Sequence, residues 1–258
     1  MTSSLSVEGN RILHPASLKL GRILNRPNRF IINAEVDGQP VRCHCPSTGR
    51  IGGYTLDGLP CLLSGPHDLT KRSTEYTVEA FAVQEPGTEG FQWIGINQTA
   101  MNSYVHAAME AGLLKAALPT AAAGTVQKEK KLGSSRIDFL VGGDTWVEVK
   151  MPLTIIEAES HGLAPKDFKP KIGIDRMLNQ LGDLTSALDS GQRALMISAF
   201  AYDMPDFSVP GATSRRKFGP LPAMVAAQKA GLERWQLNFS FHPTHVKLEK
   251  FFELPPRR

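Results

Sequence analysis

Short runs in which apolar and polar residues alternate, broken by Gly and Pro, fill the first third of the chain. This period of two residues predicts β-strands. The pair Asp37-Gly38 joins the first two runs and tolerates the positive φ angles of a hairpin turn. The predicted strands cover residues 28–36, 39–45, 60–64 and 76–81. Strands this short and closely spaced favour a small barrel, and we expect an OB-like barrel, a fold that commonly binds single-stranded nucleic acid.

The pattern changes beyond residues 84–90, a stretch rich in Pro and Gly. Such a stretch is typical of a domain boundary, so we expect an OB-like domain over 1–86 and a second domain over 87–258. In the second part, apolar residues at helical spacing alternate with short apolar runs. They predict helices over 99–117, 174–189 and about 222–230, and strands over 137–141, 146–149, 194–200 and about 235–241. This order predicts a mixed α/β domain after the barrel, in a chain of the α+β or α/β class.

Charged residues interrupt the hairpin expected over 135–150, although its apolar runs otherwise look like core. Asp138 lies in the first run, Glu148 lies in the second, and Lys150 follows directly. Because side chains alternate along a strand, Glu148 and Lys150 share one face, and a tight hairpin brings Asp138 beside Glu148. Two buried carboxylates repel each other and are costly to bury unpaired. A divalent cation removes that cost, and oxygen ligands suit Mg²⁺ or Mn²⁺.

The spacing Asp…Glu-x-Lys is that of metal-dependent phosphodiester cleavage, in which the metal acidifies the attacking water. Asp138, Glu148 and the carbonyl of Val149 are the expected metal ligands, and Lys150 would orient or help to deprotonate the water. Glu129, upstream of the hairpin, is a candidate further acid. The competing interpretation is structural, because Glu-x-Lys on a solvated strand and Asp beside a Gly-Gly turn are both common.

The formal net charge of +4 and the pI of about 9.0 permit a nucleic-acid partner without requiring one. Basic residues near the first strands could form one phosphate-binding face, although a solvated charged surface is the commoner outcome. These residues are Arg22, Arg26, Arg29, Lys71 and Arg72.

Three cysteines, an odd number, argue against a disulfide framework and favour a reducing cytoplasm. Cys43-His44-Cys45 suggests zinc at first sight, but in a strand His44 points away from both cysteines. No apolar run approaches the roughly 20 residues that span a bilayer. The first residues also lack the apolar stretch of a secretory signal. We therefore expect a cytoplasmic protein with no membrane partner.

Several motifs, taken in order along the chain, are similar to those of the sugar fermentation stimulation protein A family. They are Asp37-Gly38, His44-Cys45-Pro46-Ser47-Thr48-Gly49-Arg50, Ile96-Asn97, Ser135-Arg136-Ile137-Asp138-Phe139 and Val147-Glu148-Val149-Lys150. The resemblance implies an OB-like domain joined to a restriction-endonuclease-like PD-(D/E)xK domain, with DNA as the ligand. It adds His44, Arg50, Arg136 and Arg176 to the candidate nucleic-acid contacts, with Arg50 reaching toward phosphate.

The chain departs from the family pattern at three places. Gly133 leads directly into Ser134 where the family has a longer acidic insert, and Met151-Pro152 follows the Glu-Val-Lys motif. On the next helix, Gln180 stands where the resemblance leads us to expect a His, one turn after Arg176. A Gln there still hydrogen-bonds a phosphate or a water but does not titrate near neutral pH. We count Gln180 among the catalytic candidates, while its identity puts cleavage in question.

The expected function is DNA binding with Mg²⁺- or Mn²⁺-dependent phosphodiester cleavage. The first alternative is a non-catalytic DNA-binding regulator that uses the nuclease-like domain as a scaffold. A small-molecule hydrolase ranks lower, because it would leave the basic N-terminal segments without a role. The sequence does not decide whether the ligand is DNA or RNA, or whether it is single- or double-stranded. It also leaves the oligomeric state open, with a homodimer as one option.

Overall fold

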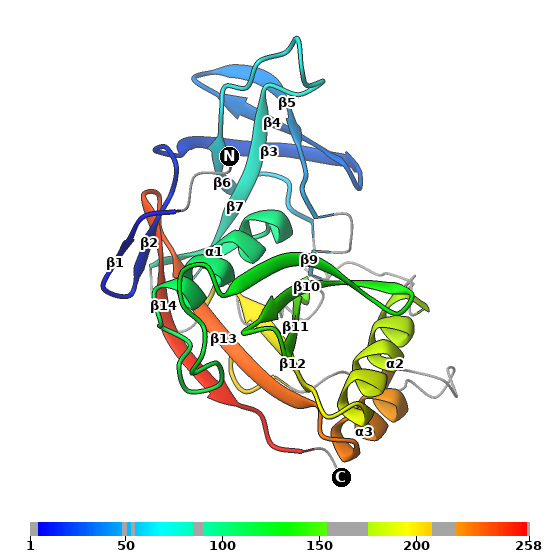
Figure 1. Cartoon of the computed structure of the whole chain (residues 1–258). Coiled ribbons are helices and arrows are strands. Elements are labelled where there is room, and N and C mark those ends of the chain that lie inside the picture. Colours follow the sequence, from blue (N-terminus) through cyan, green and yellow to red (C-terminus); the bar gives the residue numbers. More distant parts are fainter. Residues whose placement is uncertain are drawn as a thin grey trace.

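The structure is a computed structural model that describes residues 5–47, 51–52, 55–84, 90–153, 175–207 and 220–256. Two sheets dominate it (Figure 1). The six-stranded sheet runs in the order β5-β4-β3-β6-β7-β8, and the eight-stranded sheet in the order β1-β2-β14-β13-β12-β11-β10-β9.

The first sheet contains β3 (Lys19–Asn28), β4 (Ile31–Val36), β5 (Gln39–His44), β6 (Pro60–Ser64), β7 (Tyr76–Gln84) and β8 (Phe91–Gly95). The second contains β1 (Val7–Glu8), β2 (Arg11–Leu13), β9 (Val126–Leu132), β10 (Ser135–Val141), β11 (Thr145–Lys150), β12 (Arg193–Phe200), β13 (Glu233–Phe241) and β14 (His245–Glu253). The helices are α1 (Gln98–Glu110), α2 (Asp175–Asp189) and α3 (Pro220–Lys229).

The first sheet closes into a five-stranded barrel, which confirms the predicted OB-like fold. Parallel pairing of the edge strand β5 with β7, through Cys43 with Tyr76 and His44 with Thr77, closes the barrel and leaves β8 outside it. The strands around the closed barrel follow the order β3-β4-β5-β7-β6. Apolar side chains fill its interior, and the three free cysteines are buried as part of that packing.

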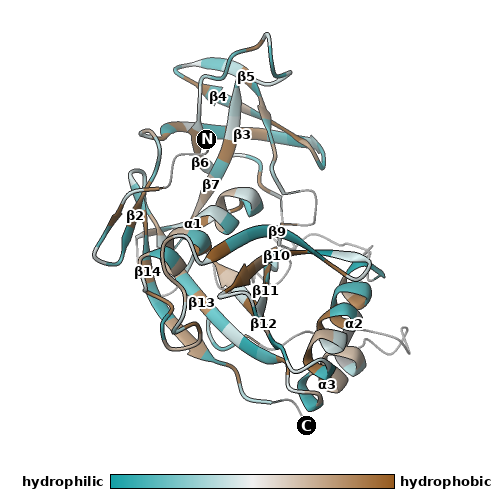
Figure 2. Cartoon of the chain, viewed as in Figure 1, coloured by the Kyte–Doolittle hydropathy of each residue, from teal (hydrophilic) through white to brown (hydrophobic). Residues whose placement is uncertain are grey.

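The second sheet has a parallel centre with antiparallel flanks. The strands β11, β12 and β13 run parallel, while β9, β10 and β14 pair antiparallel with their neighbours. Figure 1 shows α1 between the barrel and this sheet, with α2 and α3 side by side near β12. In Figure 2 the inner strands β10 and β11 are apolar, whereas the edge strand β9 is largely hydrophilic. Together these layers confirm the mixed α/β domain expected after the barrel.

Several element boundaries differ from the predicted ones. The predicted first strand began at residue 28, but a ten-residue strand, β3, precedes it. Most of the side chains of β3 are exposed, so its apolar alternation is weak, and Pro27 further disguises it. The first helix ends at Glu110 instead of residue 117, because Gly112 takes a φ of 71° that ends the helix. The strands β1, β2, β8, β9 and β14 were not predicted.

Strand pairing does not follow the predicted boundary after residue 86. The strand β8 pairs with β7, so the first sheet continues beyond residue 86. The strands β1 and β2 join the second sheet through β14. Barrel and sheet pack directly, since a Cβ on Gly95 would lie 2.5 Å from the Cβ of Ala201. Among the described residues no helix combines the length and apolarity needed to cross a membrane.

Candidate active site

The hairpin of β10 and β11 brings Asp138 and Glu148 together, as the alternation of side chains predicted. The pairs Phe139–Val147 and Leu140–Trp146 set the register, which continues to place Asp138 opposite Glu148. The Val149 backbone N–H donates a hydrogen bond of 2.8 Å to Asp138 Oδ2. The two acids therefore lie at the point where the regular strand pairing ends.

Glu148 is almost fully buried, with an exposed fraction of 1%. Its Oε1 accepts hydrogen bonds from Lys150 Nζ at 2.5 Å and from Gln180 Nε2 at 2.6 Å. Lys150 Nζ also donates to Gln180 Oε1 at 2.7 Å, so the three side chains form a closed triangle. Glu148 Oε2 has no hydrogen-bond partner within the part of the chain that the structure describes. A buried carboxylate oxygen in this state is costly, which makes it a natural ligand for a cation.

Both acids hold their protons more tightly than usual. Burial raises the pKa of Asp138, and the Val149 N–H and Lys150 oppose that shift. Burial also raises the pKa of Glu148, where Lys150 lowers it and the neighbouring Asp138 raises it further. Perturbed acids in a pocket are typical of functional sites, although structural charge networks produce them too.

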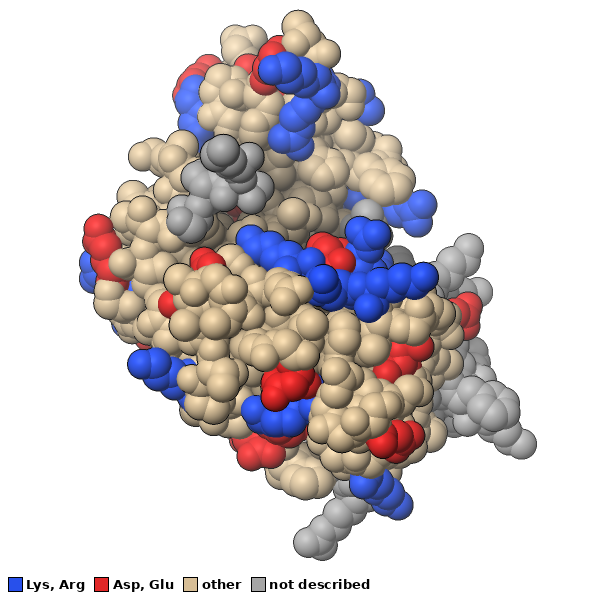
Figure 3. Space-filling view, in the orientation of Figure 1, with Lys and Arg blue, Asp and Glu red and all other residues tan. Residues whose placement is uncertain are grey.

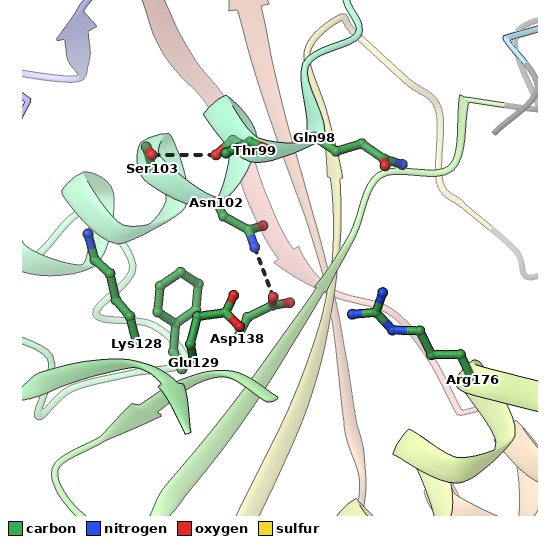
Figure 4. A pocket seen from close by; sticks show the side chains of 9 residues that line it. Gln98, Thr99, Asn102, Ser103, Lys128, Glu129, Asp138 and Arg176 are labelled. Carbon is green, nitrogen blue, oxygen red and sulfur yellow. Dashed lines mark hydrogen bonds between the residues drawn. The ribbon is translucent and has the colours of Figure 1, made fainter. Parts of the chain in front are cut away.

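A pocket of about 310 Å³ opens beside Asp138. It is bounded by the start of α1, by β9 and β10, and by Arg176 at the start of α2 (Figure 4). In Figure 4 the Arg176 guanidinium points toward the Asp138 carboxylate from the opposite wall. The pocket therefore combines acidic and basic groups, as binding of a metal ion and a phosphate requires.

Glu129 reaches this pocket through an unusual backbone conformation. Its φ of 52° lies in the left-handed region, which costs a residue other than Gly of the order of 1 kcal/mol. The register of β9 with β10 places it opposite Asp138, and Figure 4 shows the two carboxylates side by side. Consecutive residues of a regular strand point to opposite faces, yet Lys128 and Glu129 both line the pocket. The kink therefore brings a third acid to the site.

Asn102 is a site residue that the sequence pattern did not single out. Its side-chain amide, on α1, donates a hydrogen bond of 2.8 Å to Asp138 Oδ1. With the Val149 N–H on Oδ2, this bond fixes the orientation of the carboxylate. The available signal was weak: Asn102 is a poor helix former, but Gln98, Thr99, Ser103, His106 and Glu110 are polar residues of the same helix.

The donor set fits a weakly held divalent cation. Asp138, Glu148 and the carbonyl of Val149 supply oxygen atoms only, as Mg²⁺ and Mn²⁺ prefer. Within the described ranges no group of three or more His, Cys, Asp or Glu side chains converges on one point. Water would therefore supply most of the coordination sphere. The Cys43-His44-Cys45 segment is a poor zinc site, since burial raises the pKa of the Cys43 thiol to about 12.

The basic residues of the barrel do not share one role. Arg22 donates to the carbonyl of Gly58 at 2.8 Å, and Arg26 donates to the carbonyl of Ser47 at 2.8 Å. These two brace the backbone of the barrel. Arg29, Lys71 and Arg72 are exposed, and Lys71 lies 3.5 Å from Asp68. Arg50, the remaining candidate on this domain, lies outside the described residues, while His44 ends β5.

A second basic region lies along β9. Figure 3 shows Lys and Arg side chains in a band across the molecule, below a hollow under the barrel, where Figure 1 draws β9. None of the ion pairs between described residues includes a lysine of β9. The exposed basic residues of β9, β10 and the start of α2 are Lys128, Lys130, Lys131, Arg136 and Arg176. Arg136 and Arg176 were expected as nucleic-acid contacts, whereas the lysines were not.

Comparisons with known proteins cover both sheets. Residues 24–96 match the family described as "SfsA N-terminal OB domain", and residues 99–245 match "Sugar fermentation stimulation protein RE domain". A "Sugar fermentation stimulation protein homolog" of Methylobacterium nodulans is 31% identical over 246 residues, which cover 93% of this chain and 97% of that protein. One of Synechococcus sp. (strain JA-2-3B'a(2-13)) is 31% identical over 235 residues, covering 89% and 90%.

A solved structure shares the whole fold. It is titled "The structure of Pyrococcus Furiosus SfsA in complex with Ca2+", and it superposes with a TM-score of 0.70 over 98% of each chain. The two sequences are 19% identical, so this likeness concerns the fold. The barrel, the mixed second domain and their order along the chain are therefore common to both proteins.

Proposed function

The chain belongs to the sugar fermentation stimulation protein family, and from this premise we propose that it binds DNA and cleaves phosphodiester bonds with the help of Mg²⁺ or Mn²⁺. The observation that carries the proposal is the state of Glu148. It is a buried carboxylate beside a second acid, with one oxygen that has no partner among the described residues. Such an arrangement is costly unless a cation completes it.

Asp138, Glu148 and the carbonyl of Val149 would hold the metal. When bound, a divalent cation lowers the pKa of a coordinated water and offsets the charge that develops on the phosphate. The relative of the same fold that was solved with Ca²⁺ supports this assignment, because Ca²⁺ also takes oxygen ligands.

The protein's own side chains then have separate tasks. Asn102 and the Val149 N–H hold Asp138 in one orientation. Lys150 Nζ, on the partly exposed side of the triangle, orients the attacking water by donating a hydrogen bond to it. Arg176, across the pocket, pairs with the non-bridging oxygens of the phosphate.

Gln180 limits this chemistry. It holds Lys150 and Glu148 in place, but its amide neither accepts nor releases a proton near neutral pH. We therefore expect slow cleavage. Glu129, which lies beside Asp138 in a left-handed conformation, would share a second metal or a water.

The competing candidate is a DNA-binding regulator without catalysis. The observation in its favour is that two side chains of the protein, Lys150 and Gln180, satisfy Glu148 Oε1. In that case the triangle is a structural network, and the nuclease-like domain serves as a scaffold for the basic surface.

Incubation of the full chain with labelled single- and double-stranded DNA in Mg²⁺, Mn²⁺ or EDTA distinguishes the two candidates. We expect slow cutting in Mn²⁺ that EDTA stops and Lys150→Ala abolishes, while DNA binding changes little. Lys247→Ala is a matched control, because Lys247 also pairs with a Glu two residues away in a strand, at 3.0 Å, far from the site. Equal trace cutting by wild type and Lys150→Ala would mean that the regulator is correct.

A further inference from the structure

The barrel carries a cluster of side chains that the cleavage site does not use. In OB folds, oligonucleotides bind over the second and third strands, between the loop joining the first and second strands and the loop joining the fourth and fifth. Here the first of these loops is the turn between β3 and β4, with Arg29 and Phe30. The second is the connection 65–75 between β6 and β7, and the third strand, β5, ends at His44.

Two basic side chains of the long connection contact one hydroxyl group, and a third basic residue lies on the neighbouring strand. His67 Nε2 and Arg72 Nη2 each lie 3.2 Å from Thr77 Oγ1. His44 is the residue that pairs with Thr77 where β5 closes the barrel. Residues from β5, β7 and the long connection thus meet at one place, although 33 positions separate His44 from Thr77 (77 − 44).

Arg72 carries the positive charge of this cluster. Burial, and then the nearby Arg72, lower the pKa of both His44 and His67, so neither ring adds a full charge at neutral pH. Arg72 lowers the pKa of one nearby carboxylate, Glu79. Glu79 is buried and already accepts hydrogen bonds from Ser64 and Asn97. Among the ion pairs of the described residues, none includes Arg72. An anion placed between these groups would pair with Arg72, accept hydrogen bonds from the two imidazole rings and favour their protonation.

Phe30, whose backbone lies against His44, carries an exposed aromatic ring. Phe30 is 44% exposed, and its carbonyl accepts a hydrogen bond of 2.7 Å from the N–H of Cys45, the residue after His44. The Arg29 guanidinium lies 4.6 Å from the centre of the ring. An exposed ring next to basic groups is how single-stranded nucleic acids are bound without sequence preference, since bases stack on aromatic side chains.

We propose that Phe30, His44, His67 and Arg72 form a nucleotide subsite for single-stranded nucleic acid. His44, His67 and Arg72 contact one phosphate, and an unpaired base stacks on Phe30 beside Arg29. This inference rests on the nucleic-acid ligand of the proposed function but is independent of its chemistry. It assigns the barrel a preference for single strands.

Fluorescence anisotropy with the full chain and a labelled oligothymidylate of about 12 nucleotides tests the subsite, since one OB fold covers roughly 4–16 nucleotides. Phe30→Ala should weaken binding roughly 5- to 100-fold. Arg72→Gln should weaken binding and reduce the salt slope by about 0.7, the value for one phosphate of a single strand. Phe91→Ala, at a ring that is 70% exposed on β8, and Lys247→Gln, on β14 of the second sheet, are the matched controls and should bind like wild type.

Thermal unfolding of each variant shows that it remains folded, so that a loss of binding reports the subsite. The proposal is overturned if Phe30→Ala binds the oligothymidylate like Phe91→Ala, or if Arg72→Gln leaves the salt slope unchanged. It is also overturned if a duplex binds wild type as tightly as the single strand.

The proposed function is tested separately in the same preparations. Glu148→Gln should abolish cleavage while the oligothymidylate still binds. If Phe30→Ala and Arg72→Gln bind and cleave like wild type, the subsite is refuted and the proposed active site stands. If those two variants lose binding and wild type shows no metal-dependent cutting, the subsite stands and the proposed cleavage is refuted.

Discussion

Replacing Glu148 with Gln tests whether the buried carboxylate lowers the stability of the metal-free protein, a cost that a bound metal would remove. Because burial raises its pKa, the folded chain binds this proton more tightly than the unfolded chain. Stability from Glu148 is therefore fully present below the ordinary carboxyl pKa and is lost as pH rises through the raised pKa. At neutral pH the ionised group is a cost to the metal-free fold, and Gln removes that cost.

Two opposing contributions set the size of the effect. An unpaired buried polar atom such as Glu148 Oε2 costs about 1–3 kcal/mol, and more when it is charged. Against this, loss of the charge weakens the hydrogen bonds from Lys150 and Gln180, by about 1 kcal/mol. The raised pKa indicates that the first contribution is larger. We expect Glu148→Gln to stabilise the metal-free protein by about 1 kcal/mol, or about 2–4 °C in Tm for a chain of this size.

Thermal unfolding at neutral pH in EDTA, repeated with millimolar Mn²⁺, measures both states. Wild type should gain stability with Mn²⁺, because the metal binds the folded chain preferentially, whereas Glu148→Gln should gain little. Glu249→Gln is the control, because Ser240 and Lys247 outweigh burial and lower the pKa of Glu249. That variant should be unchanged or slightly less stable. A lower Tm for Glu148→Gln in EDTA would refute the reasoning, since it would mean that pairing with Lys150 outweighs burial.

Three further predictions concern the surroundings of the acids. Asn102→Ala removes the donor to Asp138 Oδ1 and should weaken Mn²⁺ binding about tenfold, measured by calorimetry, because Asn102 orients a metal ligand. Unchanged affinity would mean that Asn102 only contributes to packing. Gln180→His should raise the rate of Mn²⁺-dependent cleavage, measured in single turnover, and an equal or lower rate would show that the family's His is not what limits this chain. Glu129→Gly should raise Tm by a few degrees, because Gly adopts a φ of 52° without strain, and a fall in Tm would show that contacts of Glu129 outweigh its backbone cost.

The sequence by itself determined the hairpin and the acids on it. Alternation along 135–150 and the Gly-Gly turn are local properties of the backbone, so they place Asp138 opposite Glu148 and Lys150 beside it without reference to the rest of the chain. The same reasoning held for the closely spaced strands of the barrel. It was weaker for β3, because a strand with mostly exposed side chains carries little apolar periodicity.

Only the tertiary structure decided which helices meet those acids and which strands share a sheet. Asn102 reaches Asp138 across 36 residues, and Gln180, which only the family resemblance had suggested, reaches Lys150 across 30. No local pattern marks such contacts, because they depend on which buried faces pack together. The same holds for β1 and β2, which pair with β14 at the other end of the chain. Local alternation specifies a strand and its two faces, whereas the partner of each face is set by burial of apolar surface over the whole fold.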